Sequence, residues 1–359
     1  MGDFETIQEI VLAAYRKMTS DIWDHVTGGS ESETTLRRNR QSLDSLAFRP
    51  RVLRDVTGID SSTTFLGRHF ALPVFLAPVG SLEDIYPEGG LACLRAAAAF
   101  GIPMFLSSVV KMQLETAAAT TEKNLVFQLY VQGDADWVDR NLERVEKSGC
   151  TAFCLTVDTA IYSRRERNLF NRYAPSGRRR GPREGFNYQA TMTWDLVDKI
   201  RNRFDIPVIV KGIATAEDAR LAVEHGVQVI YVSNHGGRQL DHGRASIDVL
   251  PGVVEAVDGR ADVLVDGGFV RGSDILKAIA LGARAVGIGK LQAWALAAGG
   301  EATLTGMLEI LEKEIAVNMA LLGVTRLDQL DSSYLHPATP VTFPDAFSPF
   351  PSLAMLLGS

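Results

Sequence analysis

Short apolar runs alternate with amphipathic stretches along most of the chain. The runs are rich in β-branched and aromatic residues, which is typical of buried strands. They occupy eight places: Leu72–Val79, Ile102–Leu106, Leu125–Val131, Ala152–Val157, Ile206–Val210, Val229–Val232, Val263–Val265 and Ala285–Ile288. Helical patterns lie between most of them: Gly90–Phe100, Trp137–Lys147, Ala216–Glu224 and Ser273–Leu281. This alternation predicts an α/β protein with a (β/α)₈ TIM barrel. A doubly wound open sheet is the alternative, but no Gly-x-Gly-x-x-Gly follows the first strand.

The two ends of the chain carry helical patterns outside this alternation. Phe4–Met18 has an apolar stripe, and Asp21–Val26 predicts a short second helix that ends at Gly28-Gly29. Ala302–Leu322 is amphipathic, and we expect the Pro-rich tail after Ser333 to be extended over the surface. We therefore expect one domain over residues 1–359, with an N-terminal extension (1–64), a barrel core (65–300) and a terminal helix with its tail (301–359).

The longest connection runs from Tyr173 to Tyr188, after the fourth predicted strand. It contains the arginine-rich sequence Arg178-Arg-Arg-Gly-Pro-Arg183 and has no apolar periodicity. A long loop at this end of a barrel is often a lid over the active site. A solvated, disordered loop explains the same composition equally well.

Composition limits the classes of protein that the chain can belong to. Apolar residues make up 46% of the 359, enough for a sizeable core, and the formal net charge of −6 argues against a nucleic-acid-binding protein. No window approaches the roughly 20 apolar residues of a membrane span, and no secretory signal is visible at the start. The three cysteines, Cys93, Cys150 and Cys154, form no CxxC pair and suit a reduced, cytoplasmic protein. We expect no metal site and no membrane partner.

Polar or glycyl residues follow nearly every predicted strand, where a purely structural barrel has no need of them. In a TIM barrel the catalytic groups lie at these carboxyl ends. His235 and Arg238 follow one strand, and together they can remove a proton from a small anionic substrate and hold its carboxylate. A buried structural histidine beside a surface arginine is the alternative. Asp158 can orient His235, and Lys211 can stabilise a developing anion.

Two glycine-rich strand ends indicate a phosphate site. They are Asp266-Gly-Gly268 and Gly289-Lys290, and their backbone N–H groups can bind phosphate oxygens. The strand ends together predict a bound cofactor that carries a phosphate.

On these motifs the chain resembles the FMN-dependent 2-hydroxy acid oxidase and dehydrogenase family, which includes glycolate oxidase, lactate oxidase and mandelate dehydrogenase. The similarity extends from Gly28 to Leu322. Its most specific parts are Ser233-Asn-His-Gly-Gly-Arg-Gln-Leu-Asp241, Leu155-Thr-Val-Asp158 with Arg164-Arg165, Pro207-Val-Ile-Val-Lys-Gly212 and Asp266-Gly-Gly268.

The resemblance implies a role for each matching position. His235 removes a proton from the substrate and Asp158 supports the imidazolium, while Arg165 and Arg238 hold the carboxylate and Tyr130 binds the hydroxyl. Lys211 lies beside the flavin and favours its reduced anion. The other positions that the resemblance assigns to FMN are Ala77, Pro78, Val79, Gly80, Ser108, Gln128, Thr156, Ser233, Asp266, Gly267, Gly268, Arg271, Gly289 and Lys290.

The chain also departs from the family pattern. We place Trp23 where the family has a carboxylate-binding tyrosine. Val109 and Tyr162 replace the tryptophan and leucine that line the glycolate oxidase pocket. One phosphate arginine is replaced by Val270, with Arg271 next to it, and a second by Lys290, which keeps the charge but loses the planar fork.

The resemblance implies FMN-dependent oxidation of an L-2-hydroxy acid to the 2-oxo acid, with O₂ or another acceptor reoxidising the flavin. It also implies a homo-oligomer, tetrameric in the family. Two alternatives remain at this point: another FMN-barrel reaction such as type 2 isopentenyl diphosphate isomerisation, and a catalytically silent flavin-binding protein. The first does not need a carboxylate clamp, and the second does not need His235, Asp158 and Arg238 together.

Overall fold

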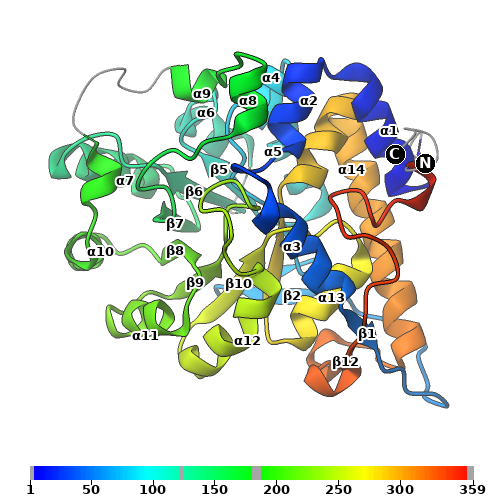
Figure 1. The fold of residues 1–359 in the computed structure, drawn as a ribbon. Helices are drawn as coiled ribbons and strands as arrows, with labels where there is room; N and C mark the ends of the chain where they lie inside the picture. The colour runs from blue at the N-terminus through cyan, green and yellow to red at the C-terminus, as the bar shows by residue number, and fades with distance from the viewer. Residues whose placement is uncertain (1–3, 122–123, 180–186, 354–359) are drawn as a thin grey trace.

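Eight parallel strands form a closed barrel in the computed structural model, which describes residues 4–121, 124–179 and 187–353. Neighbouring strands follow chain order, as β5 to β10 do in Figure 1, and β11 closes the ring by pairing with β4. The strands are β4 (Val74–Leu76), β5 (Met104–Ser107), β6 (Leu125–Leu129), β7 (Ala152–Thr156), β8 (Val208–Ile213), β9 (Val229–Val232), β10 (Asp262–Asp266) and β11 (Ala285–Ile288). The predicted TIM barrel is confirmed, and each predicted apolar run overlaps one of its strands.

Helices follow the strands and cover the outside of the barrel, so most of the strand residues are buried on both faces. They are α4 (Leu82–Ile85), α5 (Gly89–Phe100), α6 (Leu114–Thr120), α7 (Ala135–Lys147), α10 (Trp194–Arg203), α11 (Ala216–Glu224), α12 (Ser246–Val257), α13 (Gly272–Ala280) and α14 (Lys290–Leu322). The connection from β7 to β8 contains α8 (Glu166–Phe170), α9 (Ser176–Arg179) and a 3₁₀ turn (Tyr188–Thr191). The patterns did not predict α4, α6, α8, α9, α10 or α12.

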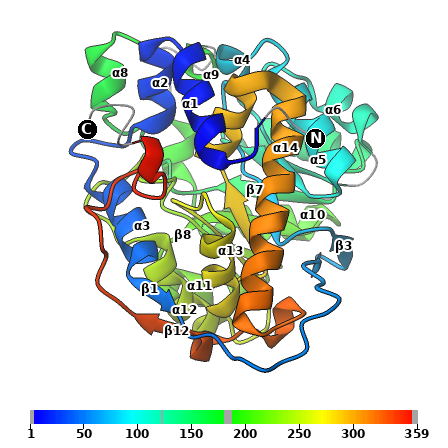
Figure 2. The same ribbon diagram turned by 90° about the vertical axis from the view of Figure 1, so that its right-hand side faces the viewer.

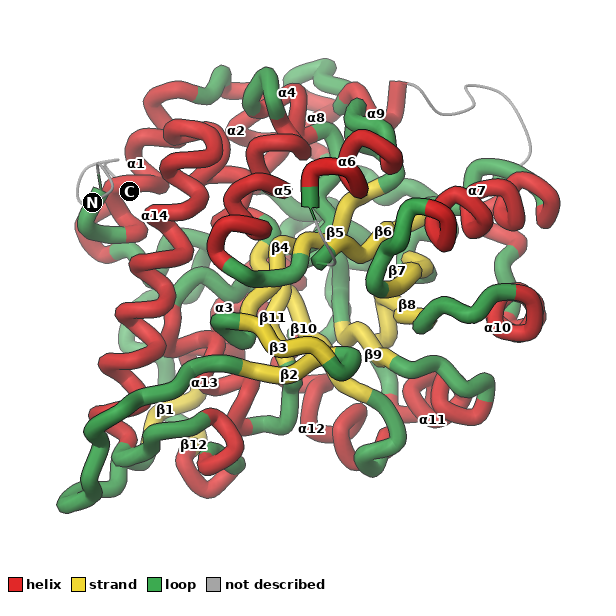
Figure 3. The backbone as a smooth tube through the Cα atoms, turned by 180° about the vertical axis from the view of Figure 1, so that it is seen from behind, coloured by secondary structure: helices red, strands yellow, loops and turns green. Residues whose placement is uncertain are grey.

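A β-hairpin lies across the amino-terminal end of the barrel. It consists of β2 (Thr63–Phe65) and β3 (Arg68–Phe70), and Figure 3 shows it below the strands. Phe65 and Phe70 are buried in the same apolar cluster as Phe75, Phe105 and Tyr231 inside the barrel. The predicted boundary at residue 64 is therefore wrong, because it falls inside β2. With this end closed by packed rings, the opening for a ligand is at the carboxyl ends of the strands.

The N-terminal extension packs along the side of the barrel. Its helices are α1 (Ile7–Lys17), α2 (Ser20–Thr27) and α3 (Thr34–Asp44), of which α3 was not predicted. Arg40 of α3 forms a buried ion pair with Asp274 of α13, with 2.8 Å between Nη2 and Oδ1. This pair fixes the extension to the helix that follows β10.

The C-terminal tail is more ordered than the expected extended segment. Its first part forms β12 (Leu335–Pro337), which pairs antiparallel with β1 (Leu46–Phe48) of the extension. Farther along, Phe347 and Phe350 pack on Trp294 of α14, at ring-centroid distances of 5.9 and 6.2 Å. Tail and extension therefore lie side by side on one face (Figure 2).

Candidate active site

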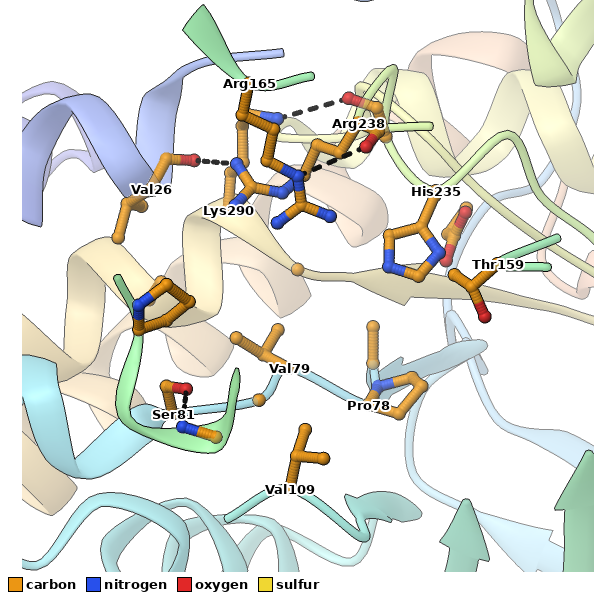
Figure 4. Close-up of a pocket in the computed structure, with 18 of the residues that line it drawn as sticks. Val26, Pro78, Val79, Ser81, Val109, Thr159, Arg165, His235, Arg238 and Lys290 are labelled. Atoms are coloured by element: carbon orange, nitrogen blue, oxygen red, sulfur yellow. Dashed lines mark hydrogen bonds between the residues drawn. The ribbon is translucent and has the colours of Figure 1, made fainter. Parts of the chain in front are cut away.

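A cavity of about 500 Å³ opens at the carboxyl ends of the strands. Its wall includes the loops after most of the barrel strands, together with Val26 of α2, Gly177 of α9 and Ala346 of the tail. Figure 4 shows His235, Arg165, Arg238 and Lys290 around one side of this cavity, with Val79 and Val109 opposite them. The strand ends thus bring most of the predicted residues to one place.

His235 lies between an acid and a phenol. Its Nδ1 is 3.0 Å from Asp158 Oδ1, and its Nε2 is 3.3 Å from Tyr130 Oη. The residue follows β9 with a φ of 58°, a left-handed conformation that a non-glycine residue rarely adopts and that often marks a functional site. Gly236 and Gly237 continue this turn with positive φ. The backbone therefore points the imidazole into the cavity.

The surroundings keep His235 neutral and Asp158 ionised. Burial lowers the pKa of His235 below its usual value, and Lys211 adds to this, although Asp158 works in the opposite direction. Burial disfavours the Asp158 carboxylate, yet Lys211 and His235 hold its pKa below the usual value. A neutral imidazole with a fixed carboxylate behind it is the state that a general base needs.

Lys211 is buried between two carboxylates at the end of β8. Its Nζ lies 3.8 Å from Asp158 Oδ2 and 3.9 Å from Asp266 Oδ2, and it donates a hydrogen bond of 3.0 Å to Ser233 Oγ. Burial opposes its charge, but Asp158 and Asp266 raise its pKa above the usual value. The ammonium is therefore a fixed positive charge at the cavity wall.

Arg165 and Arg238 form a pair of buried cations beside His235. Arg165 Nε donates to the backbone oxygen of Arg238 at 3.2 Å, and Arg238 Nη1 donates to the oxygens of His25 and Gly28 at 2.6 and 2.8 Å. Burial and the charge of Arg165 lower the pKa of Arg238 to about 9. Two guanidinium groups so close together favour an anion between them, and a carboxylate fits their planar forks.

The far side of the cavity fits FMN. Ala77, Pro78, Val79 and Gly80 line one stretch of the wall, and the buried Oε1 of Gln128 has no hydrogen-bond partner among the described residues, so it can accept from a flavin N–H group. Thr156, Ser108 and Ser233 are not part of the cavity lining but are bonded to neighbouring residues. Thr156 Oγ1 accepts from Gln128 Nε2 at 2.9 Å, Ser108 Oγ accepts from the backbone N–H of Tyr130, and Ser233 Oγ donates to Asp266 Oδ1 at 2.6 Å.

The predicted phosphate end is built mainly from backbone. Gly267 and Gly268 have φ of 112° and 89°, and Gly289 is the N-cap residue of α14. Lys290 lines the cavity at this corner and donates to the backbone oxygen of Gly236 at 3.3 Å. Backbone N–H groups and one ammonium suit a phosphate.

Two predicted site residues lie elsewhere. Trp23 stacks on Trp294 and Phe347, with ring centroids 6.2 and 5.8 Å apart, and is not part of the cavity wall. Arg271 is bound to Glu314, with 2.6 Å between Nη2 and Oε1, and it does not line the cavity either. Both expectations are corrected: the first residue belongs to an aromatic core and the second to an ion pair with α14.

His25 takes the place on α2 that we had given to Trp23. The two residues lie on opposite sides of the helix, and His25 lines the cavity. Its Nδ1 lies 3.0 Å from Asn168 Nδ2 and 3.4 Å from Asn168 Oδ1, so this side-chain amide holds the ring in place. Burial, Arg238 and Arg165 lower the pKa of His25 to about 2, which keeps the imidazole neutral. The position of His25, three residues before Gly28 at the end of α2, could have indicated a site residue, but the apolar pattern of this helix drew attention to Trp23.

The first part of the predicted lid is held against the barrel. The backbone N–H groups of Ser176 and Gly177 donate to Asp84 Oδ2 and Ser81 Oγ at 2.7 and 2.9 Å. Arg178 lies over the ring of Tyr162, 4.1 Å from its centroid, and both residues line the cavity. Residues 180–186, with Arg180 and Arg183, lie outside the described part of the chain.

Known proteins with similar sequences agree with the interpretation of this site. The family profile of FMN-dependent dehydrogenases matches residues 14–337. The chain belongs to this family. It is 38% identical to glycolate oxidase 3 of Arabidopsis thaliana, over 93% of this chain and 96% of that protein. It is 39% identical to an L-lactate oxidase of Nostoc sp., over 88% and 93%.

Solved structures of mandelate oxidase have the same fold. One, a tyrosine-to-phenylalanine variant with (S)-mandelic acid, superposes with a TM-score of 0.87 at 37% identity, over 94% of this chain and all of that one. Another, with benzoyl-formic acid, gives 0.87 at 38%. Family membership identifies the chain as an FMN-dependent oxidoreductase of 2-hydroxy acids. Within residues 4–121, 124–179 and 187–353, no helix is long and apolar enough to cross a membrane, and no group of His, Cys, Asp and Glu side chains could hold a metal ion.

Proposed function

We propose that the enzyme oxidises an L-2-hydroxy acid with a side chain larger than that of glycolate to its 2-oxo acid. The observation that carries the proposal is the position of the neutral His235 between Asp158 and Tyr130, beside the buried pair Arg165 and Arg238. Base and anion site therefore lie next to each other on one wall of the cavity. Neither an isopentenyl diphosphate isomerase nor a silent flavin-binding protein needs this combination.

Each residue has a role in the proposed reaction. Arg165 and Arg238 bind the carboxylate, and His25 donates a hydrogen bond on the same side. Tyr130 binds the hydroxyl group of the substrate, and His235 removes one proton from the substrate while Asp158 stabilises the imidazolium. FMN, when bound, would accept the two electrons and the other hydrogen. Lys211 lies at the wall as a positive charge that favours a reduced, anionic flavin.

The wall around the substrate side chain supports a larger substrate. Val109 is a small residue at this position, and Tyr162 adds an aromatic surface. Glycolate would leave this space unfilled, whereas a longer aliphatic or mandelate-like side chain would gain contacts, with about 0.8 kcal/mol for each buried methylene group. The mandelate oxidase structures named above are consistent with this preference.

We further propose O₂ as the electron acceptor, because the glycolate, L-lactate and mandelate oxidases that the chain resembles are oxidases by name. A cytoplasmic homotetramer with the whole chain as one domain remains our proposal, based on the absence of cysteine pairs and on the family resemblance.

Anaerobic mixing of the FMN-loaded enzyme with a panel of 2-hydroxy acids tests the proposal. We expect flavin bleaching with higher kcat/KM for mandelate and 2-hydroxyhexanoate than for glycolate. His235→Ala should keep its flavin but bleach about 10²–10⁴-fold more slowly, because general-base catalysis contributes that much. Flavin that stays oxidised with every acid, or bleaching at an unchanged rate in His235→Ala, would contradict the proposal.

A further inference from the structure

The charges of the cavity wall do not balance. Its lining includes six cationic side chains and a single carboxylate, that of Asp266. The cations are Arg40, Arg165, Arg178, Lys211, Arg238 and Lys290. An excess of positive charge at a cavity wall selects anionic ligands.

Two of the six cations are neutralised inside the protein. Arg40 is held by Asp44 and Asp274 at 2.7 and 2.8 Å, and Lys211 lies between Asp158 and Asp266. Four cations remain. The proposed function uses Lys290 for the phosphate of FMN and the pair Arg165 and Arg238 for the substrate carboxylate, which leaves Arg178.

Arg178 is held at the side-chain end of the cavity. Its helix α9 is fixed to the loop after β4 through Ser81 and Asp84, as described above. Its guanidinium carbon lies 4.1 Å from the centre of the Tyr162 ring, and Arg165 lies over the same ring at 4.5 Å. Tyr162 thus contacts both the carboxylate-binding Arg165 and Arg178. No carboxylate forms an ion pair with Arg178 among the described residues.

We infer that Arg178 binds a second anionic group at the end of the substrate side chain, so that the preferred substrates are 2-hydroxy dicarboxylates. The inference rests on the proposed function, because it assumes that Arg165 and Arg238 hold the first carboxylate. It also gives a role to the first arginine of the arginine-rich sequence, which the reaction itself does not use.

Substrate pairs that differ only in charge test the inference. L-malate and L-2-hydroxyglutarate are compared with their terminal amides, which have nearly the same shape, in steady-state assays of the FMN-loaded enzyme. In the better of the two pairs, we expect kcat/KM to be about tenfold higher for the dicarboxylate than for its amide. This is the lower end of the range for a charge-assisted hydrogen bond, because Arg178 is partly in solvent. Higher ionic strength should reduce this preference.

Three variants separate a charge contact from a structural role. Arg178→Gln should lose the preference for the charged member, while its kcat/KM for the amides stays within about twofold of wild type. Arg178→Lys should retain part of the preference, since it keeps the charge but not the planar fork. Arg220→Gln on α11, an exposed arginine that does not line the cavity, is the matched control and should behave as wild type.

Binding provides a readout that does not depend on turnover. The spectral change of the flavin on addition of 2-oxoglutarate, compared with its terminal amide, should show the same tenfold preference in wild type and none in Arg178→Gln. Equal use of both members of each pair by wild type, or an equal loss for both in Arg178→Gln, would overturn the inference alone. If none of the hydroxy acids, charged or neutral, reduces the flavin, the proposed function fails with it.

Discussion

At the scale of single residues, the strand-end rule predicted where the cavity lies but not every side chain that lines it. His235, Asp158, Lys211 and Arg238 were predictable, because a parallel barrel places all its strand ends on one face. The expectation that Trp23 binds the substrate was wrong because it did not consider which face of the helix the residue is on. A shift of two residues along a helix turns a side chain to the other face. The structure brings His25 to the cavity instead and buries Trp23 in a stack of rings.

Lys290 provides a pH-dependent prediction at this scale. Burial and the charges of Arg238 and Arg165 lower the pKa of Lys290 to about 7. Phosphate favours the charged ammonium, so above pH 7 the apoprotein must take up a proton on binding FMN. We therefore expect the affinity for FMN to be highest below pH 7 and to fall as the pH rises through 7 to 9.

Fluorescence titration of the apoprotein with FMN at several pH values measures this dependence. Lys290→Arg stays charged over this pH range, so its affinity for FMN should decline much less than that of wild type. Lys290→Gln should bind FMN weakly at every pH. A decline of equal slope in all three proteins would assign the effect to another group.

At the scale of elements, the strands were predicted more accurately than the helices. β9 and β11 have the predicted bounds, since β-branched runs have no other stable place in such a fold. The predicted Leu72–Val79 run shrinks to β4, because Pro73 and Pro78 lack the N–H groups that a longer ladder requires. α12 was missed because Pro251 and Gly252 interrupt its pattern, although the helix continues through them. The Tyr173–Tyr188 loop was undecidable, since its ordered part depends on Ser81 and Asp84, far away in the sequence.

The loops after β4 and β5 touch each other at the side-chain wall, and this contact predicts coupling between two positions. A Cβ atom at position 80 would lie 2.6 Å from Val109 Cγ2. Gly80→Ala should therefore force Val109 out of its rotamer at a cost on the order of 1 kcal/mol. Gly80→Ala combined with Val109→Ala removes the clash, so the loss should be smaller than the sum of the two single changes.

The measurement is a double-mutant cycle of unfolding free energies. We expect a coupling energy of about 1 kcal/mol, within the range for residues in contact. Additive effects would show that the two loops move apart freely when position 80 gains a methyl group.

At the scale of the whole molecule, the two ends of the chain meet on one side of the barrel and complete the cavity wall. β1 pairs with β12, and Trp23 from α2 stacks with Phe347 from the tail. Local sequence patterns could not predict these contacts, because they join residues from opposite ends of the chain. The packing of the expected extended tail was missed for the same reason: its aromatic residues have a partner, Trp294, that no local pattern reveals.

The tail should therefore contribute to stability. Phe350 is fully buried against Trp294, and Phe350→Ala should lower the free energy of unfolding by about 3–5 kcal/mol, as for other buried phenylalanines. Phe343 in the same tail is 81% exposed, so Phe343→Ala is the matched control and should stay within about 0.5 kcal/mol of wild type. Urea titration followed by tryptophan fluorescence measures both variants, and similar losses would mean that the tail is not packed as described.

The contribution of Ala346 to the cavity wall has a consequence for the making of the enzyme. A ribosome adds residues from the N-terminus, and domains begin to fold while the chain emerges. The barrel strands and His235 leave the ribosome before the tail, but the wall that faces Val26 is incomplete until Ala346 and the rings after it have followed. Full enclosure of the cavity is thus a late event of biosynthesis, and a prematurely terminated chain retains His235 in an open, poorly shielded pocket.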